Sequence, residues 1–241
     1  MRKVCKRLCC LVAIAGIPVA GLAQMYDGPP CRSGGDASIR AKLKLGVIKK
    51  LSAVWFGDYQ NWSTSYLPAS GKPPPARDCG NDDECLEQSL IEDHTWTCQY
   101  SARSARDGNP RTAWCEGVKG DGIGEILLAE VDTRRPVQVW AGYGKSRKLH
   151  RANGRPRKVR LSVLRADEFG VTENGPVYGG LHVLATHEVE LKDVFGYQPL
   201  PLPEHAVPEK NVATVIAVEI LSVFKGDRYR DTCISEIKTG S

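Results

Sequence analysis

The stretch 106-RDGNPRTAWCEGVKGDGIGE-125 carries the most distinctive residues of the chain. A second distinctive stretch, 231-DTCISEI-237, lies near the C-terminus. The first begins with a loop and the second has the composition of a closing strand. About a hundred residues with short alternating apolar patterns separate them. We expect the two stretches to be neighbours in space, which would close a β-sandwich.

Alternation of apolar and polar residues recurs between these stretches, at 137–140, 158–163 and 188–191. Such alternation is typical of strands with one wet face. Residues 214–224, TVIAVEILSVF, are almost continuously apolar and β-branched, which indicates a central strand or one leading into an edge. Glycine and proline separate the runs, and no helical crossover is evident. The pattern predicts an all-β fold, a β-sandwich of the jelly-roll kind.

The N-terminus explains most of the net charge of +5. Residues 1–23 show a basic start, an apolar run and a small-residue end, as a secretory signal peptide does. Their removal takes four of the 33 basic side chains and none of the 28 acids, leaving 29 against 28. A nearly neutral mature chain argues against a nucleic-acid partner. We expect a secreted or periplasmic protein with no transmembrane segment after signal removal, a retained N-terminal anchor being the alternative.

Six of the nine cysteines remain after residue 23. An even number in an exported protein predicts a disulfide framework of three bonds, with about fifteen possible connectivities. Zinc is disfavoured because no pair of cysteines has the C-x-x-C spacing. Residues 24–93 form a cysteine-containing N-terminal segment that we expect to be an appendage. Within it, residues 37–56 fit one amphipathic helix or two strands, and we favour the helix.

Five collinear blocks connect the remainder, 94–241, to a known family. They are DGNPRTAW at 107–114, AGYGKS at 141–146, ANGRPRK at 152–158, LKD at 191–193 and the run 223–237. Over residues 95–240 the sequence resembles the discoidin-like (F5/8 type C, galactose-binding-like) domain found beside bacterial NAD glycohydrolases, the NADase-type glycan-binding or translocation domain. The resemblance implies a sandwich that binds carbohydrate and performs no chemistry. Residues 24–90 are too few to hold the NAD-cleaving domain.

Discoidin-like domains also imply a structural calcium ion beneath the first loop, with a glutamate from the last strand. Oxygen donors suit calcium. The matching positions here are Asp107, Asn109, Thr112 and Glu236, with main-chain carbonyls of Arg106 and Asn109. Asn109 stands where many relatives carry aspartate, which lowers the negative charge. The alternative is a plain Asp-Gly turn capped by Thr112, with Glu236 in solvent.

The same resemblance suggests roles for Trp114 and two cysteines. Trp114 follows the calcium-type loop inside an alternating segment, so we interpret it as a core anchor rather than a platform for a sugar ring. Cys115 and Cys233 lie in the two blocks that we expect to meet, and this is the pairing we favour.

A glycan site needs hydrogen-bonding groups and an aromatic face, and the loop-like residues that supply them are Tyr143, Lys145, Asn153 and Arg155. Between Arg134 and Arg165 there are eleven Lys or Arg and no acid, which favours an anionic glycan. We expect Lys158 and Arg160 on an outward strand face. The alternative is that Tyr143 packs under its loop and the bases are a solvated face.

Catalysis is not indicated. The five histidines are scattered, and the chain contains no nucleophile elbow, phosphate loop or dinucleotide fingerprint. We therefore predict no catalytic residues and a secreted glycan-binding module. The alternative function is a secreted protein-interaction factor, an adaptor or inhibitor, that acts through residues 24–93 and uses the sandwich as a scaffold.

Overall fold

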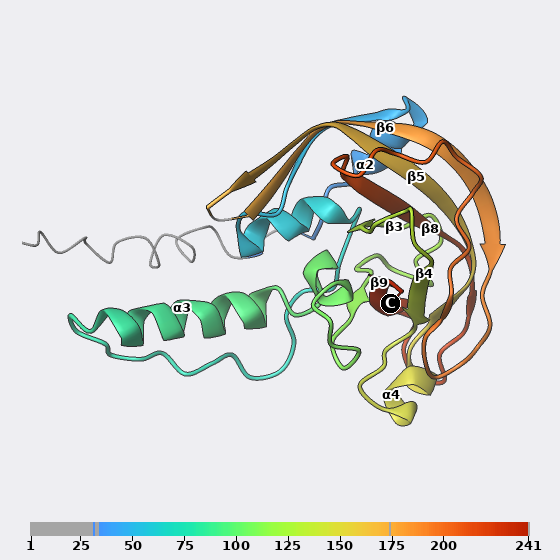
Figure 1. Cartoon of the computed structure of the whole chain (residues 1–241). Coiled ribbons are helices and arrows are strands. Elements are labelled where there is room, and N and C mark those ends of the chain that lie inside the picture. Colours follow the sequence, from blue (N-terminus) through green and yellow to red (C-terminus); the bar gives the residue numbers. More distant parts are fainter. Residues whose placement is uncertain (1–30, 32–33, 174, 241) are drawn as a thin grey trace, which may run out of the picture.

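A computed structural model describes residues 31, 34–173 and 175–240 (Figure 1). The predicted signal peptide, residues 1–23, lies outside the described residues. No helix among the described residues is long and apolar enough to cross a membrane.

Two antiparallel sheets form the body of the protein (Figure 1). The larger has the strand order β1 (Val47–Ser52), β6 (Gly175–Glu190), β5 (Arg155–Thr172), β8 (Thr214–Phe224), β3 (Ile126–Glu130). The smaller has the order β2 (Trp114–Cys115), β9 (Cys233–Thr239), β4 (Val137–Ala141), β7 (Gln198–Pro199). The predicted all-β sandwich is confirmed.

Short helical elements connect the strands. They are α2 (Ile39–Lys44), the 3-10 helix η1 (Phe56–Trp62), α3 (Asp83–Thr97), the 3-10 helix η2 (Ala102–Ala105) and α4 (Arg147–Ala152). With 15 residues, α3 is the longest of the described helices, and Figure 1 shows it outside the sandwich.

The core follows from the predicted alternation. On β5, Val159, Leu161 and Val163 are fully buried, whereas Lys158 and Arg160 between them reach the surface. The continuous apolar run of β8 lies between β5 and β3, so it is an inner strand, and its first five residues are buried. Strands of this composition are stable only when both faces are covered.

Residues 37–56 do not form the single helix that we favoured. The helix α2 ends at Lys44, Gly46 adopts a positive φ of 78°, and β1 then pairs with β6 from Val47↔His182 onward. The apolar residues at 47, 48 and 51 fit the spacing of a helix as well as that of a strand. The turn at Gly46 ends the helix and lets the following residues form a strand. This stretch is an edge of the larger sheet rather than an appendage.

Three disulfides are formed, as predicted: Cys31–Cys98, Cys79–Cys85 and Cys115–Cys233. The favoured pairing of Cys115 with Cys233 is confirmed, and these two residues are also paired across β2 and β9. The bond joins positions 118 residues apart, so it restricts the unfolded chain far more than Cys79–Cys85, which spans 6.

Replacing both Cys115 and Cys233 with serine should therefore lower the free energy of unfolding by about 5 kcal/mol, against about 2 kcal/mol for the same change at Cys79 and Cys85. Urea unfolding of the two double variants measures both values. Equal losses would contradict the view that this bond closes the fold.

Candidate functional site

The two distinctive stretches of the sequence meet where β2 joins β9. Trp114 pairs with Ile234, and Cys115 with Cys233. The Trp114 side chain is fully buried, and its Nε1 donates a hydrogen bond of 2.9 Å to the Ser65 carbonyl. The expected contact is confirmed, and Trp114 is a core anchor that no sugar ring can reach.

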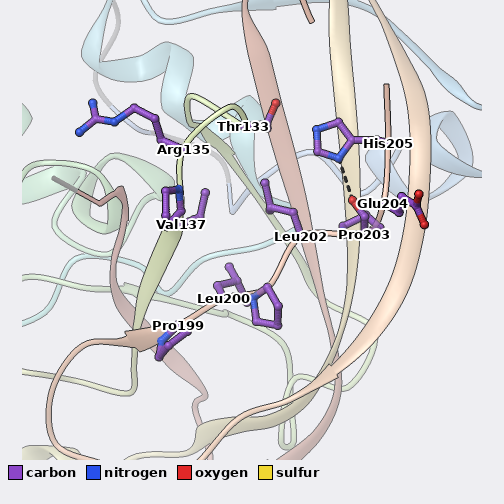
Figure 2. A pocket seen from close by; sticks show the side chains of 11 residues that line it. Thr133, Arg135, Val137, Pro199, Leu200, Leu202, Pro203, Glu204 and His205 are labelled. Carbon is purple, nitrogen blue, oxygen red and sulfur yellow. Dashed lines mark hydrogen bonds between the residues drawn. The ribbon is translucent and has the colours of Figure 1, made fainter. Parts of the chain in front are cut away.

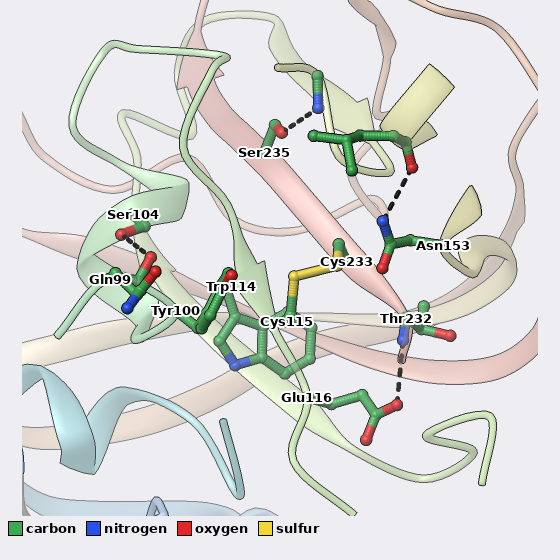
Figure 3. Close-up of a disulfide and its surroundings, with 12 residues drawn as sticks. Gln99, Tyr100, Ser104, Trp114, Cys115, Glu116, Asn153, Thr232, Cys233 and Ser235 are labelled. Carbon is green, nitrogen blue, oxygen red and sulfur yellow. Dashed lines mark hydrogen bonds between the residues drawn. A yellow bond between two sulfur atoms is a disulfide. The ribbon is translucent and has the colours of Figure 1, made fainter. Parts of the chain in front are cut away.

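Glu116 follows this pair and is also fully buried. Its Oε1 accepts the Thr232 backbone N–H at 3.0 Å (Figure 3). Its Oε2 accepts the backbone N–H of Val118 at 2.9 Å. Burial raises the pKa of this carboxyl to about 7. The carboxylate ties the glycine-rich loop 117–124 to the start of β9, a role that the sequence analysis did not assign.

The Asp-Gly turn is stabilised by its own residues. The Asp107 carboxylate accepts the Asn109 backbone N–H at 2.9 Å and the Thr112 hydroxyl at 2.8 Å. Gly108 has a positive φ of 74°, a conformation that favours glycine. Thr112 thus caps the turn, as in the alternative prediction of an Asp-Gly turn capped by this residue.

Glu236, however, is not in solvent. Its side chain is buried beneath the turn, where it accepts the Gly108 backbone N–H, and its Oε2 has no hydrogen-bond partner among the described residues. Burial and the neighbouring charge of Asp107 raise the pKa of Glu236 to about 7. A cation held between these carboxylates would satisfy the orphaned oxygen and offset the repulsion.

The donors present thus fit a calcium ion: two carboxylates, the Thr112 hydroxyl and main-chain carbonyls. They do not amount to a dense ligand cluster, because the described residues contain no group of three or more His, Cys, Asp or Glu side chains at metal-binding distance. Calcium binding by Asp107, Asn109, Thr112 and Glu236 stays a prediction.

The four predicted sugar-binding residues lie in different environments. Tyr143 is half-buried, with its ring edge-on to Tyr100 at 6.4 Å between centroids, and burial raises its pKa to about 12. Lys145 is exposed. The Asn153 amide donates to the Leu149 carbonyl at 2.8 Å and ends α4, so its side chain serves the loop itself.

Arg155 joins three segments of the chain. Its guanidinium forms a two-point ion pair with Asp193, at 3.0 and 2.7 Å, and donates to the carbonyls of Asn153 and Lys225. Only 7% of Arg155 is exposed. Asn153 and Arg155 therefore hold the loops around the end of α4. Direct contact of Tyr143, Lys145, Asn153 and Arg155 with a glycan stays a prediction.

The run of eleven bases is not one basic face. Acids from neighbouring strands neutralise part of it: Lys158 pairs with Glu188 at 2.6 Å, and Arg160 with Glu219 at 2.6 Å. Further bases in the run, Arg134, Arg155 and Arg165, pair with Asp132, Asp193 and Asp167. Charge counted along one strand overlooks the strands beside it.

Six bases of the run remain, of which Arg135 donates to the Gly240 carbonyl and Arg157 lies over the Phe224 ring. The other four form a cluster at α4, which we call the cationic end: Lys145, Arg147, Lys148 and Arg151. All four are exposed, and none forms an ion pair within the described part of the chain. Ser146 caps α4 by accepting the Leu149 backbone N–H at 3.1 Å.

Two further loops support the cationic end. The Tyr229 backbone N–H bonds to the Ala152 carbonyl at 2.7 Å, and Tyr229 is 39% exposed, with the Arg228 guanidinium 5.1 Å from the centre of its ring. On the other side, the Arg147 guanidinium lies 4.8 Å from the centre of the Phe195 ring. The end thus combines cations with aromatic rings. Sequence reasoning missed Phe195 and Tyr229, although both flank quoted blocks or lie within them.

A different hollow, of about 390 Å³, lies between β4 and the proline-rich residues 199–205 (Figure 2). Its wall is mainly apolar, with Val137, Leu200 and Leu202 among the lining residues. None of the predicted site residues lines it.

Comparison with known proteins identifies one family. The NAD glycohydrolase translocation F5/8 type C domain matches residues 86–240. Solved structures with partial similarity include the arabinofuranosyltransferase AftD from Mycobacteria, at 16% identity and a TM-score of 0.33 over 58% of this chain and 9% of that one. Another is a Ruminococcus gnavus GH29 fucosidase in complex with fucose, at 12% and 0.31 over 60% and 23%. Curated proteins give no match.

The environment of Glu236 predicts a pH dependence. Because its folded-state pKa is raised from 4.5 to about 7, the native state favours the protonated form, and stability should fall as pH rises between these values. In a calcium-free buffer, Glu236→Gln should reduce this pH-dependent fall in the free energy of unfolding by an amount on the order of 1–3 kcal/mol. A fall caused by Glu116, whose pKa is also raised to about 7, should remain. Urea unfolding from pH 4 to pH 8 measures this, with exposed Glu190→Gln as the control. An unchanged drop in Glu236→Gln would contradict the assignment.

Proposed function

This chain belongs to the NAD glycohydrolase translocation F5/8 type C domain family, and we propose that it is a secreted, non-catalytic carbohydrate-binding module. Export is supported by three disulfides, which persist in oxidising compartments, and by the signal-like residues 1–23. The ligand that we propose is a glycan bearing carboxylate or sulfate groups.

The observation that carries this proposal is the cationic end. Four exposed bases without acidic partners lie on and before α4, whose end contacts the partly exposed Tyr229. Arginine forks suit carboxylate and sulfate groups, and an aromatic face suits a sugar ring. In this proposal Lys145 contacts the ligand, while Asn153 and Arg155 hold the loops that present the bases, as their internal hydrogen bonds suggest.

Calcium has a structural role in this proposal. Bound by Asp107 and Glu236, it would fix the Asp-Gly turn onto β9 and so strengthen the contact between the two ends of the domain. The orphaned, buried Oε2 of Glu236 supports this role.

Neutralising the cationic end should weaken glycan binding. Arg147→Gln, Lys148→Gln and Arg151→Gln together should reduce affinity for a sulfated or uronic-acid glycan at least tenfold, because each removes an unpaired charge. The matched control changes three exposed lysines of α2 and β1 to glutamine: Lys44, Lys49 and Lys50. Binding is measured on a glycan array and by titration at low and high salt. Equal losses in both variants, or tight salt-independent binding to a neutral sugar, would refute the proposal.

Calcium should stabilise the wild-type chain. We expect its melting temperature to rise with calcium concentration, since an ion that binds only the native state shifts the unfolding equilibrium. Glu236→Gln should abolish the rise, whereas Glu190→Gln should keep it. Differential scanning calorimetry with and without a chelator measures the effect, and a wild-type melting temperature indifferent to calcium would show that no ion binds.

A further inference from the structure

Residues 70–97 leave the body of the protein, and we call them the arm. Figure 1 shows α3 and the chain beside it extending away from both sheets. Within α3 only His94 is buried, where its ring lies 5.7 Å from that of Phe56. The helix therefore contributes almost nothing to the core.

The arm is nevertheless braced. The Cys79–Cys85 disulfide ties its tip to the first turn of α3, and Asp82 caps the helix by accepting the Cys85 backbone N–H at 3.1 Å. Arg77 pairs with Glu92 at 2.6 Å across the arm. A fifteen-residue helix with little burial is marginal in water, so these links maintain its shape. A segment that is held in shape but buries almost nothing is suited to bind another molecule.

One face of α3 combines charge with apolar side chains. Leu86 and Leu90, one turn apart, are 44% and 37% exposed. By helical spacing they lie between Asp93 on one side and Asp83 and Glu87 on the other. Residues 78–93 contain seven acids and no Lys or Arg. This face has no covering element among the described residues.

The cationic end offers the complementary surface on the same chain. Its four bases lack acidic partners, and exposed Val194 (37%) and Tyr229 (39%) lie on the two loops beside α4. The exposed acids of those loops are Asp193, which forms an ion pair with Arg155, and Asp227, which is next to Arg228. The loops and α4 together thus offer exposed apolar side chains near unpaired cations, which complements the two leucines flanked by acids.

We propose that the arm of one molecule docks on the cationic end of a second copy. In Figure 1 the arm and α4 lie on different sides of the sandwich, so the contact is made between molecules. Each chain carries one arm and one cationic end, and such a contact joins molecules head to tail, in open chains or in closed rings. This proposal does not depend on glycan binding, although a polyanionic glycan would compete with the arm.

Two variants test the contact by complementation. The arm variant carries Asp83→Asn, Glu87→Gln and Asp93→Asn, which spare the cap Asp82 and the braced Glu92. The end variant carries Arg147→Gln, Lys148→Gln and Arg151→Gln. Sedimentation velocity at low salt should show the wild type growing with concentration and each variant alone as a monomer. Their mixture should give one-to-one dimers, because it retains a single intact arm-to-end contact.

Controls separate this contact from general charge attraction. Glu173→Gln, Glu190→Gln and Glu209→Gln remove three exposed acids from the sandwich and should leave association unchanged. Leu86→Ala with Leu90→Ala should weaken association at least tenfold at unchanged charge, with far-UV circular dichroism confirming that α3 persists. A monomeric wild type at low salt, or variants that fail to complement each other although the wild type associates, would overturn the proposal.

Discussion

The pairing of β2 with β9 is the contact on which the rest of the structure depends. Only two residue pairs make it, Trp114↔Ile234 and Cys115↔Cys233, yet they join positions more than a hundred residues apart. Backbone pairing, a disulfide and the buried Glu116 carboxylate reinforce one another within three consecutive residues. A long-range closure costs chain entropy before it yields contacts, so covalent and polar links at this point have a large effect.

This closure also organises the sites on either side of it. The Asp-Gly turn before Trp114 covers Glu236 on β9, and the loop after Glu116 contacts Thr232. On the other flank, Gly154 pairs with Thr232, which places the cationic end next to the last strand. The glycan site and the calcium site that we propose therefore share one support, and loosening it should affect both.

Much of the sandwich could be predicted from the sequence. The alternation in β4, β5 and β6 and the contact at Trp114 depend on local patterns and on five matching blocks. The apolar run of β8 left two positions open, a central strand or one leading into an edge, and the strand order decides for the first. The pairing of β1 with β6 could not be predicted, because residues 47–51 suit two periods. The pairing of acids on β6 and β8 with the bases of β5 was equally hidden, since it depends on strand order. Asn153 and Arg155 show a related limit: the sequence does not reveal that their side chains also hydrogen-bond to loops of the same chain.

The family match begins at residue 86, but the folded unit begins earlier. Ser65 supplies the acceptor for the Trp114 indole, and the Thr64 hydroxyl donates to the Glu125 carboxylate at 2.7 Å. Residues 63 and 64 also pair with the outer edge of β3. β1 likewise covers the edge of β6. A chain trimmed to the matched residues would expose both edges of the larger sheet, which are templates for aggregation. The stretch that matches the family is thus shorter than the stretch that the fold requires.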